Sequence, residues 1–239
     1  MSRDLQILEI DLHLFGGRGA SSGGGGGGSF TGELELPDGS KIEFEGTLSY
    51  DGDDKAVDGD IRKAIVSWED KRRKNKIEYA YAVDTNGNPI GVEVKGGKGS
   101  VRTPTAYHDT QDAVFTHIHP RGDGILGGTF SGADLRNFAG HRNKTCRAAA
   151  KEGTYSISKT KNFDQKGFLH YVRTVDADFN SKYRTKINAV YRKYKSGNIT
   201  YDQYKTENAK AFNTGLVELH NAYKSGQKQY GYTYTLEKI

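Results

Sequence analysis

The sequence predicts an α/β protein of the α+β type: a mixed, mostly antiparallel sheet with flanking helices, plus an antiparallel helical hairpin near the C-terminus. Short segments in which apolar and polar residues alternate, separated by turn residues, predict the strands. Between them, Ile61 to Lys74 carries apolar residues at the three- and four-residue spacing of a helix. Two long stretches with the same helical spacing fill most of the last third of the chain and predict the hairpin.

Changes in composition divide the chain into four parts. The run from Gly16 to Gly28 is almost entirely glycine and serine, and such a run loses too much backbone entropy on ordering to form regular structure. We therefore expect a flexible tether there. The predicted parts are a flexible N-terminal segment (1–31), a β-hairpin and helix (32–75), a metal-binding core (76–160), and a helical hairpin with a returning strand (161–239).

Turn residues locate the first strands. Alternating residues on both sides of Pro37-Asp38-Gly39-Ser40 predict a hairpin of strands at 33–36 and 41–44. The segment Asn86-Gly87-Asn88-Pro89 has the same character and predicts a turn between strands at 77–83 and 90–94. Both predictions rest on local sequence only.

The middle of the chain predicts a strand, a helix and two further strands. A short apolar strand over 113–118 ends at Pro120 and is followed by a glycine-rich loop over 121–128. Ser131 is a favoured first residue for a helix, which we expect to reach Arg142. Strands at 146–150 and 155–158, joined near Gly153, complete this region.

The last third predicts two helices and a strand. An apolar stripe from Phe179 to Tyr194 ends at Gly197, and we place this helix in a hairpin spanning 176–225. Thr200 and Gln203 form a capping box for the second helix, which ends before Gly226. The alternating residues 230–236 predict a strand that returns to the sheet.

Charge is distributed unevenly along the chain. Residues 1–134 hold 15 Lys and Arg against 22 Asp and Glu, whereas residues 135–239 hold 20 against 8. The basic C-terminal half therefore predicts nucleic acid or another polyanion as a partner, with a solvated lysine-rich helix face as the alternative. No apolar run is long enough for a membrane span, the N-terminal residues are too charged for a secretory signal, and we expect no membrane partner.

Two histidines one residue apart carry the clearest chemical signal. His117 and His119 on a strand point to the same face, because side-chain direction alternates along a strand. Asp134, near the start of the next helix, could complete a set of two imidazoles and a carboxylate. Such a set leaves one position of a zinc ion open, as in catalytic zinc sites. The alternatives are a chance His-x-His pair on a strand and an ordinary helix cap at Ser131 and Asp134.

A hydrolytic zinc site also needs a proton acceptor, and Glu78 at the start of a predicted strand is the best candidate. Weaker rivals are Glu93, Glu43 and Glu45. Cys146 is the only cysteine, which excludes an intrachain disulfide, and its apparently buried strand makes it a poor nucleophile. The glycine-rich loop lacks the Gly-Lys-Ser/Thr ending of a phosphate loop.

Glu78, His117-x-His119-Pro120 and Ser131-x-x-Asp134-Leu135 together resemble the JAMM motif of the JAB/MPN metallopeptidase superfamily. The segment 77–87 is most similar to the RadC-like branch, and the resemblance extends over about residues 76–158, with phage-encoded members similar at 148–158. The segment 15–23 is similar to one found in MuF-type phage head-morphogenesis proteins. One departure is the loop between His119 and Ser131, which is longer than the family usually has.

The resemblance implies a JAB-like core at 76–160 and a Zn²⁺ ion on His117, His119 and Asp134. It implies Glu78 as general acid/base and Ser131 as a hydrogen-bond donor to the oxyanion. It also implies a zinc-dependent peptidase or isopeptidase, encoded by a phage or mobile element, acting on a protein or peptide in the host cytoplasm or in the virion. Phage structural proteins are possible partners. Two other functions stay open at this point: a virion- or nucleic-acid-associated binding module that retains the fold, and a metal-dependent nuclease.

Overall fold

The computed structural model describes residues 29–36, 39–51, 57, 59–103, 110–120 and 124–239. Its centre is a six-stranded sheet in the order β4-β3-β5-β6-β7-β8. The strands are β3 (Tyr79–Val83), β4 (Val94–Lys95), β5 (Val114–Ile118), β6 (Thr145–Ala149), β7 (Thr154–Lys159) and β8 (Tyr232–Glu237). Helix α2 (Gly132–Gly140) connects β5 to β6, which form the one parallel pair in this sheet; its other pairs are antiparallel. The predicted α/β class, with a mixed and mostly antiparallel sheet and flanking helices, is confirmed.

The predicted hairpin near the N-terminal end of the described chain is also present. Strands β1 (Ser29–Glu35) and β2 (Lys41–Ser49) pair antiparallel in a sheet of their own. The buried side chains of β2 alternate, as expected for a strand with one covered face, and β2 packs against helix α5 (Tyr201–Ser225). The predicted flexible tether, residues 16–28, lies outside the residues that the structure describes.

The strand predicted at 90–94 is wrong. Only Val94–Lys95 pairs with β3, and a single bridge joins Val83 to Pro89. The reason lies in the preceding turn, where the Asp84 carboxylate accepts hydrogen bonds from the main-chain N–H groups of Asn86 and Asn88. This turn leads into an irregular segment. Its Val92 side chain is 78 % exposed, so the segment has no buried face of the kind that a strand would have.

The first C-terminal helix begins earlier than the predicted position 176. Helix α3 (Gln165–Phe179) starts after Asp164, whose carboxylate accepts from the N–H of Gly167. A π-helical turn, η1 (Asn180–Arg184), then joins α3 to α4 (Thr185–Lys195) without a break. Helix α5 follows with the predicted capping box at Thr200 and Gln203, and the short α6 (Gln227–Tyr230) leads into the returning strand β8. The face that buries Phe168 and Val172 continues through Val175 and Phe179, so the apolar stripe extends further toward the N-terminus than predicted.

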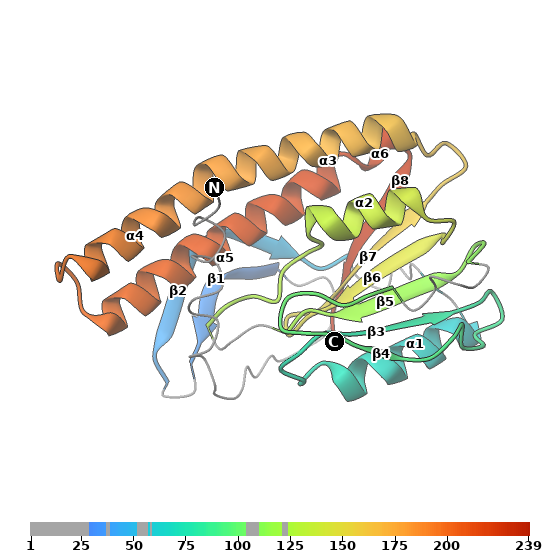
Figure 1. Cartoon of the computed structure of the whole chain (residues 1–239), viewed down its shortest axis with the longest axis horizontal. Coiled ribbons are helices and arrows are strands. Elements are labelled where there is room, and N and C mark those ends of the chain that lie inside the picture. Colours follow the sequence, from blue (N-terminus) through green and yellow to red (C-terminus); the bar gives the residue numbers. More distant parts are fainter. Residues whose placement is uncertain (1–28, 37–38, 52–56, 58, 104–109, 121–123) are drawn as a thin grey trace, which may run out of the picture.

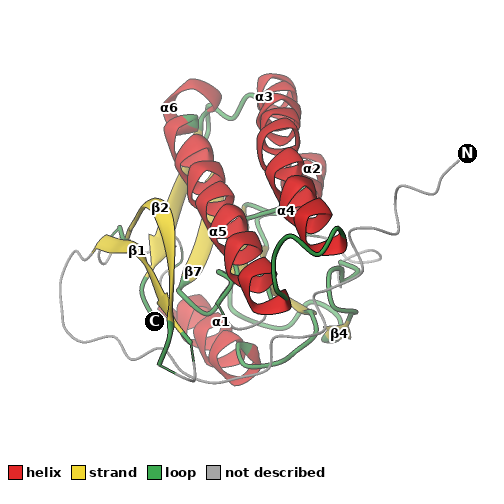
Figure 2. Cartoon of the chain, turned by 90° about the vertical axis from the view of Figure 1, so that its left-hand side faces the viewer, coloured by secondary structure: helices red, strands yellow, loops and turns green. Residues whose placement is uncertain are grey.

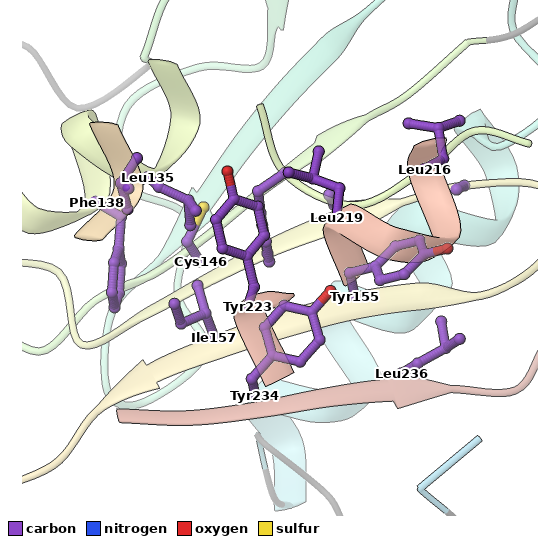
Figure 3. Packing of buried hydrophobic residues seen from close by; sticks show 14 of the residues in the cluster. Leu135, Phe138, Cys146, Tyr155, Ile157, Leu216, Leu219, Tyr223, Tyr234 and Leu236 are labelled. Atoms are coloured by element: carbon purple, nitrogen blue, oxygen red, sulfur yellow. The ribbon is translucent and has the colours of Figure 1, made fainter. Parts of the chain in front are cut away.

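The helices cover both faces of the six-stranded sheet. Helix α1 (Gly59–Arg72) lies on one face, and α2, α3 and α5 lie on the other (Figure 1). Figure 2, turned by 90°, shows the hairpin β1–β2 beside α5. Helix α1 lies at the bottom of this view, away from the other helices. The largest buried cluster fills the space under α2, α3 and α5 (Figure 3). It includes Leu135, Phe138, Cys146, Tyr155, Ile157, Leu216, Leu219, Tyr223, Tyr234 and Leu236.

The opposite face of the sheet carries a buried ion-pair network. Arg147 on β6 is 1 % exposed and binds Glu69 of α1 and Glu237 of β8, with N–O distances of 2.8 Å to each. Thr116 of β5 donates a further hydrogen bond to Glu69. A buried charge is tolerated only when it is paired, so this network requires α1 and β8 to be docked on the central strands.

None of the described helices is both long enough and apolar enough to span a membrane.

A second buried polar chain lies under α5. His220 is 1 % exposed, and its Nδ1 lies 3.1 Å from the hydroxyl of Tyr234, which in turn contacts Thr129 at 2.5 Å. Burial lowers the pKa of His220 to about 4, assisted by the positive charge of Lys224 and opposed by Asp51. His220 is therefore neutral in the folded protein at neutral pH.

This burial predicts acid sensitivity. The unfolded chain binds a proton at His220 near pH 6.5 and the folded chain only near pH 4, so the free energy of unfolding should fall as pH drops through that window, by about 3 kcal/mol from this group. Urea unfolding at several pH values should show a shallower loss for His220→Gln. The exposed His170→Gln should keep the wild-type dependence, and an unchanged slope in His220→Gln would contradict the prediction.

Candidate metal centre

Strand β5 places both histidines on the same face of the sheet. Each is buried, with His117 at 1 % and His119 at 7 % exposure. His117 lies opposite Ala80 of β3 and Ala148 of β6, so both neighbours on that face are small. This face is the one covered by α2 and not the one that carries Arg147, because Thr116 alternates with the histidines and points toward α1. The strand thus directs both imidazoles toward the start of α2.

Helix α2 supplies the carboxylate through its first turn. Ser131 caps the helix: its Oγ accepts from the N–H of Asp134 at 3.2 Å, and Asp134 Oδ2 accepts from the N–H of Ser131 at 2.8 Å. This capping box holds the Asp134 carboxylate at the N-terminal end of the helix. The Asp176 carboxylate of α3 packs directly against Gly132, because a Cβ at Gly132 would lie 1.6 Å from Oδ2 of Asp176. The start of α2 therefore lies in close contact with α3.

The glycine-rich loop between His119 and Ser131 is held by two distant side chains. The Glu152 carboxylate, in the turn between β6 and β7, accepts from the N–H groups of Gly127 and Gly128 at 2.9 and 2.7 Å. The buried Asn213 of α5 accepts from the N–H of Leu126 at 3.0 Å and donates to the carbonyl of Gly124 at 2.9 Å. These contacts satisfy main-chain groups that would otherwise be buried without partners. The added length of this loop therefore does not displace Asp134 from the histidines.

The three side chains converge. Their ligand atoms all lie within 4.8 Å of one another. Among the described residues, these three side chains are the group that could hold a metal ion. Nε2 of His117 lies 2.9 Å from Nε2 of His119 and 3.5 Å from Oδ1 of Asp134, and His119 Nε2 lies 3.6 Å from Oδ2 of Asp134. Two ligands about 2.0–2.1 Å from a tetrahedral zinc ion are about 3.3 Å apart. The donor set and its spacing thus fit a zinc ion, with Asp134 on the more exposed side at 23 % exposure.

Hydrogen bonding prepares His119 as a ligand. Its Nδ1 lies 3.1 Å from the carbonyl oxygen of Gly128, and a carbonyl can only accept, so Nδ1 carries the proton. In the neutral imidazole, Nε2 then presents its lone pair to the site. The loop carbonyl therefore sets both the orientation and the tautomer of this histidine.

The charges in the site favour a cation between the three groups. Burial lowers the pKa of His117, but the charge of Asp134 and a hydrogen bond to it raise that pKa well above its ordinary value. Burial raises the pKa of Asp134, but His117 and His119 hold it well below its ordinary range. A proton or a metal ion can supply the positive charge that the carboxylate and the two imidazoles share.

A small cavity of about 30 Å³ adjoins His117. The Cys146 thiol lies beside His117, and burial raises the pKa of this thiol, so it is protonated at neutral pH. The cavity is lined by Val101, Thr103, Phe115, His117, Asp134, Asn137, Phe138, His141, Asn143 and Cys146. Its volume suits one or two water-sized groups beside the candidate metal centre.

Glu78 lies just before β3, the strand that pairs with β5. Its main chain is held by hydrogen bonds with Gly96 and Gly97, and its side chain is partly exposed. In the antiparallel pair β3–β5, Ala80 lies opposite His117. If this register continued for two more residues, Glu78 would lie opposite His119. Residues that oppose each other across a strand pair share a face, so a continued register would put Glu78 on the face of the histidines.

The rival carboxylates lie elsewhere. Glu93 accepts hydrogen bonds from Trp68 and Arg72 of α1, on the opposite face of the sheet. Glu43 and Glu45 are exposed on β2, in the separate two-stranded sheet. None of these three therefore lies on the histidine face of the six-stranded sheet, whereas the β3–β5 register, if it continued to Glu78, would put that residue there.

Sequence reasoning did not identify the residues that assemble the site from a distance. Glu152, Asn213 and Asp176 contact the loop or the start of α2 from positions 20 or more residues away in the chain. Glu152 precedes Gly153 in a turn and Asn213 lies within a helical stripe, so local sequence contains no signal for either role.

No protein-family model, curated protein or solved structure matches this chain. The case for a function therefore rests on the geometry above.

Removing the loop's anchor should loosen the site. In Glu152→Ala, the N–H groups of Gly127 and Gly128 lose their acceptor, which should cost about 1–3 kcal/mol of stability. Zinc affinity, measured by competition with a chromogenic chelator, should fall about tenfold, as it does when groups that orient metal ligands are lost.

Tyr155→Phe is the matched control, since Tyr155 donates to the same carboxylate at 2.8 Å but leaves both loop contacts in place. Equal zinc affinity in Glu152→Ala and in wild type would show that the loop does not depend on this anchor.

Proposed function

We propose that this chain is a zinc-dependent hydrolase of the JAMM type that cleaves an amide or isopeptide bond in a protein or peptide. The observation that carries the proposal is the convergence of His117, His119 and Asp134, with donor spacings of 2.9–3.6 Å. Two imidazoles and one carboxylate leave a coordination position for water or substrate, unlike closed structural sites.

Each proposed role follows from position. When bound, zinc would supply a Lewis acid and lower the pKa of a water molecule. Glu78 is partly open to solvent, and a continued β3–β5 register would put it opposite His119; it would accept the proton from the attacking water and return it to the departing nitrogen. His119 is held in the correct tautomer by the Gly128 carbonyl.

Ser131 would donate a hydrogen bond to the oxygen of the attacked carbonyl. Its side chain is at the exposed end of α2, next to Asp134, which suits this role. At present its hydroxyl donates to Oδ2 of Asp134 at 2.7 Å. The Ser131 hydroxyl can donate to substrate only if Oδ2 of Asp134 has another positively charged partner. A bound zinc ion would be such a partner.

The proposal includes a finer statement about the fold. A strand with two histidines, a crossover helix that begins with Ser131 and Asp134, and a parallel strand β6 follow the order expected of a JAB-like core. Helix α5 runs beside α4 after a short turn, and the two pack through the rings of Tyr194 and Tyr204, 5.0 Å apart. We propose that α3–α4 and α5 form a C-terminal hairpin appended to that core, in a protein encoded by a phage or mobile element.

The first test is metal content. Protein purified without a polyhistidine tag should contain about one zinc ion per chain by elemental mass spectrometry. His117→Ala should lose the metal, because it removes one of three ligands. Protein that stays metal-free after incubation with zinc would contradict the proposal.

The second test separates catalysis from metal binding. Glu78→Gln should keep its zinc and lose about 10²- to 10⁴-fold in turnover of labelled casein or of an isopeptide-linked branched peptide. Glu43→Gln, which changes an exposed carboxylate in the other sheet, should keep wild-type activity. Cleavage of labelled DNA that depends on Glu78 would favour a nuclease, and zinc binding without hydrolysis of any of these substrates would favour a binding module.

A further inference from the structure

The outer helix of the molecule is strongly basic. The continuous run α3–η1–α4, from Gln165 to Lys195, lies furthest from the sheet (Figure 1). From Phe179 to Tyr201 the chain has six basic residues and no acidic one. The exposed basic side chains of the run are Lys166, Arg173, Lys182, Arg184, Lys186, Arg192, Lys193 and Lys195.

Only some of these charges are neutralised. Lys182 pairs with Glu218 of α5 at 2.7 Å, and Lys193 pairs with Glu207 at 3.3 Å. Within the described part of the chain, no carboxylate lies within ion-pair distance of Arg184, Arg192 or Lys195. The run has two acidic residues against eight basic ones: Asp176, which Arg136 of α2 engages at 3.0 Å, and the exposed Asp178. A net positive surface therefore remains along the outer side of the run.

The aromatic residues of this region face inward. Tyr194 stacks on Tyr204 of α5 with ring planes at 21°, and Tyr191 contacts the same ring at 6.1 Å. Single-stranded nucleic acids bind largely through bases that stack on exposed aromatic rings. On this surface the tyrosines are engaged in helix packing, and the exposed side chains are mainly charged. Such a surface favours a duplex, whose bases are already stacked on one another and whose phosphates are exposed.

The array is also extended and rigid. About 30 residues at ~1.5 Å each make a helix of roughly 45 Å, and a DNA duplex carries one charge per ~1.7 Å of its axis. Helix α5 supports the run closely: a Cβ at Gly215 would lie 2.8 Å from the ring of Tyr183 in η1. Fixed charges on a rigid helix need little ordering on binding.

We propose that the outer face of α3–α4 binds the phosphate backbone of a nucleic-acid duplex without reading its sequence. Arg184, Arg192 and Lys195 are the main contacts. The contact is electrostatic, releases counterions from the duplex, and weakens steeply with salt. It does not depend on the metal centre, since the two lie on different elements of the fold.

The test is fluorescence anisotropy with labelled DNA and RNA duplexes of about 20 base pairs, somewhat longer than the helix at ~3.4 Å per pair. Wild type and His117→Ala should bind equally. The triple variant Arg184→Glu, Arg192→Glu, Lys195→Glu should lose at least tenfold in affinity. The slope of log affinity against log salt should become shallower by about 3, because each lost phosphate contact contributes ~0.9.

A matched control carries the same change in net charge on α1 and the turn directly after it: Lys63→Glu, Lys71→Glu, Lys74→Glu, all exposed positions. It should bind as wild type does. Thermal melting followed by circular dichroism checks that both triple variants fold. If the outer-face triple Glu variant does not fold, Gln replaces Glu at the same three positions.

Three outcomes would overturn the proposal: no duplex binding by wild type at low salt, equal weakening by the α1 control, or tighter binding of a single strand than of the duplex. Binding of both duplexes indicates recognition of backbone charge, and a preference for one identifies the duplex.

Discussion

The buried charge of Arg147 is the constraint on which the rest of the structure depends. It lies in a central strand at 1 % exposure and is neutralised by Glu69 of α1 and Glu237 of β8, which are far apart in the sequence. An unpaired charge at this position would cost several kcal/mol, so α1 and the last strand must both dock before the sheet is stable. Through Thr116, the same network also fixes β5.

Because β5 is fixed on that face, the opposite face presents His117 and His119 in one orientation. Strand alternation transmits the constraint: residues that point toward Arg147 and residues that point toward α2 cannot exchange without a shift in register. The candidate metal centre and the ion-pair network therefore lie on opposite faces of the same pair of strands. Helix α2 then brings Asp134 to the histidines, and the run α3–η1–α4 carries its basic residues on the side away from the sheet.

Much of the fold follows from local patterns. The β1–β2 hairpin, α2, β6, β7 and the capping box of α5 lie close to their predicted positions, because alternation, turn residues and helix caps act over a few residues. The predictions at 90–94 and 176 were wrong because alternation and helical spacing alone do not show how far a strand or a helix extends. The irregular segment after Asp84 has no covered face, and α3 is stabilised by contacts of Phe168 and Val172 with distant parts of the core.

For the candidate site, local sequence specifies that the two histidines share a face and that Ser131 and Asp134 cap a helix, since both properties depend on backbone geometry over two or three residues. It does not specify that these groups meet. Their convergence depends on Glu152, Asn213 and Asp176, which hold the loop and the start of α2 from distant positions in the chain. Such contacts form only when the chain has folded, and hydrophobic periodicity does not encode them. Tertiary structure therefore brings together a carboxylate and two imidazoles that the sequence only lists in order.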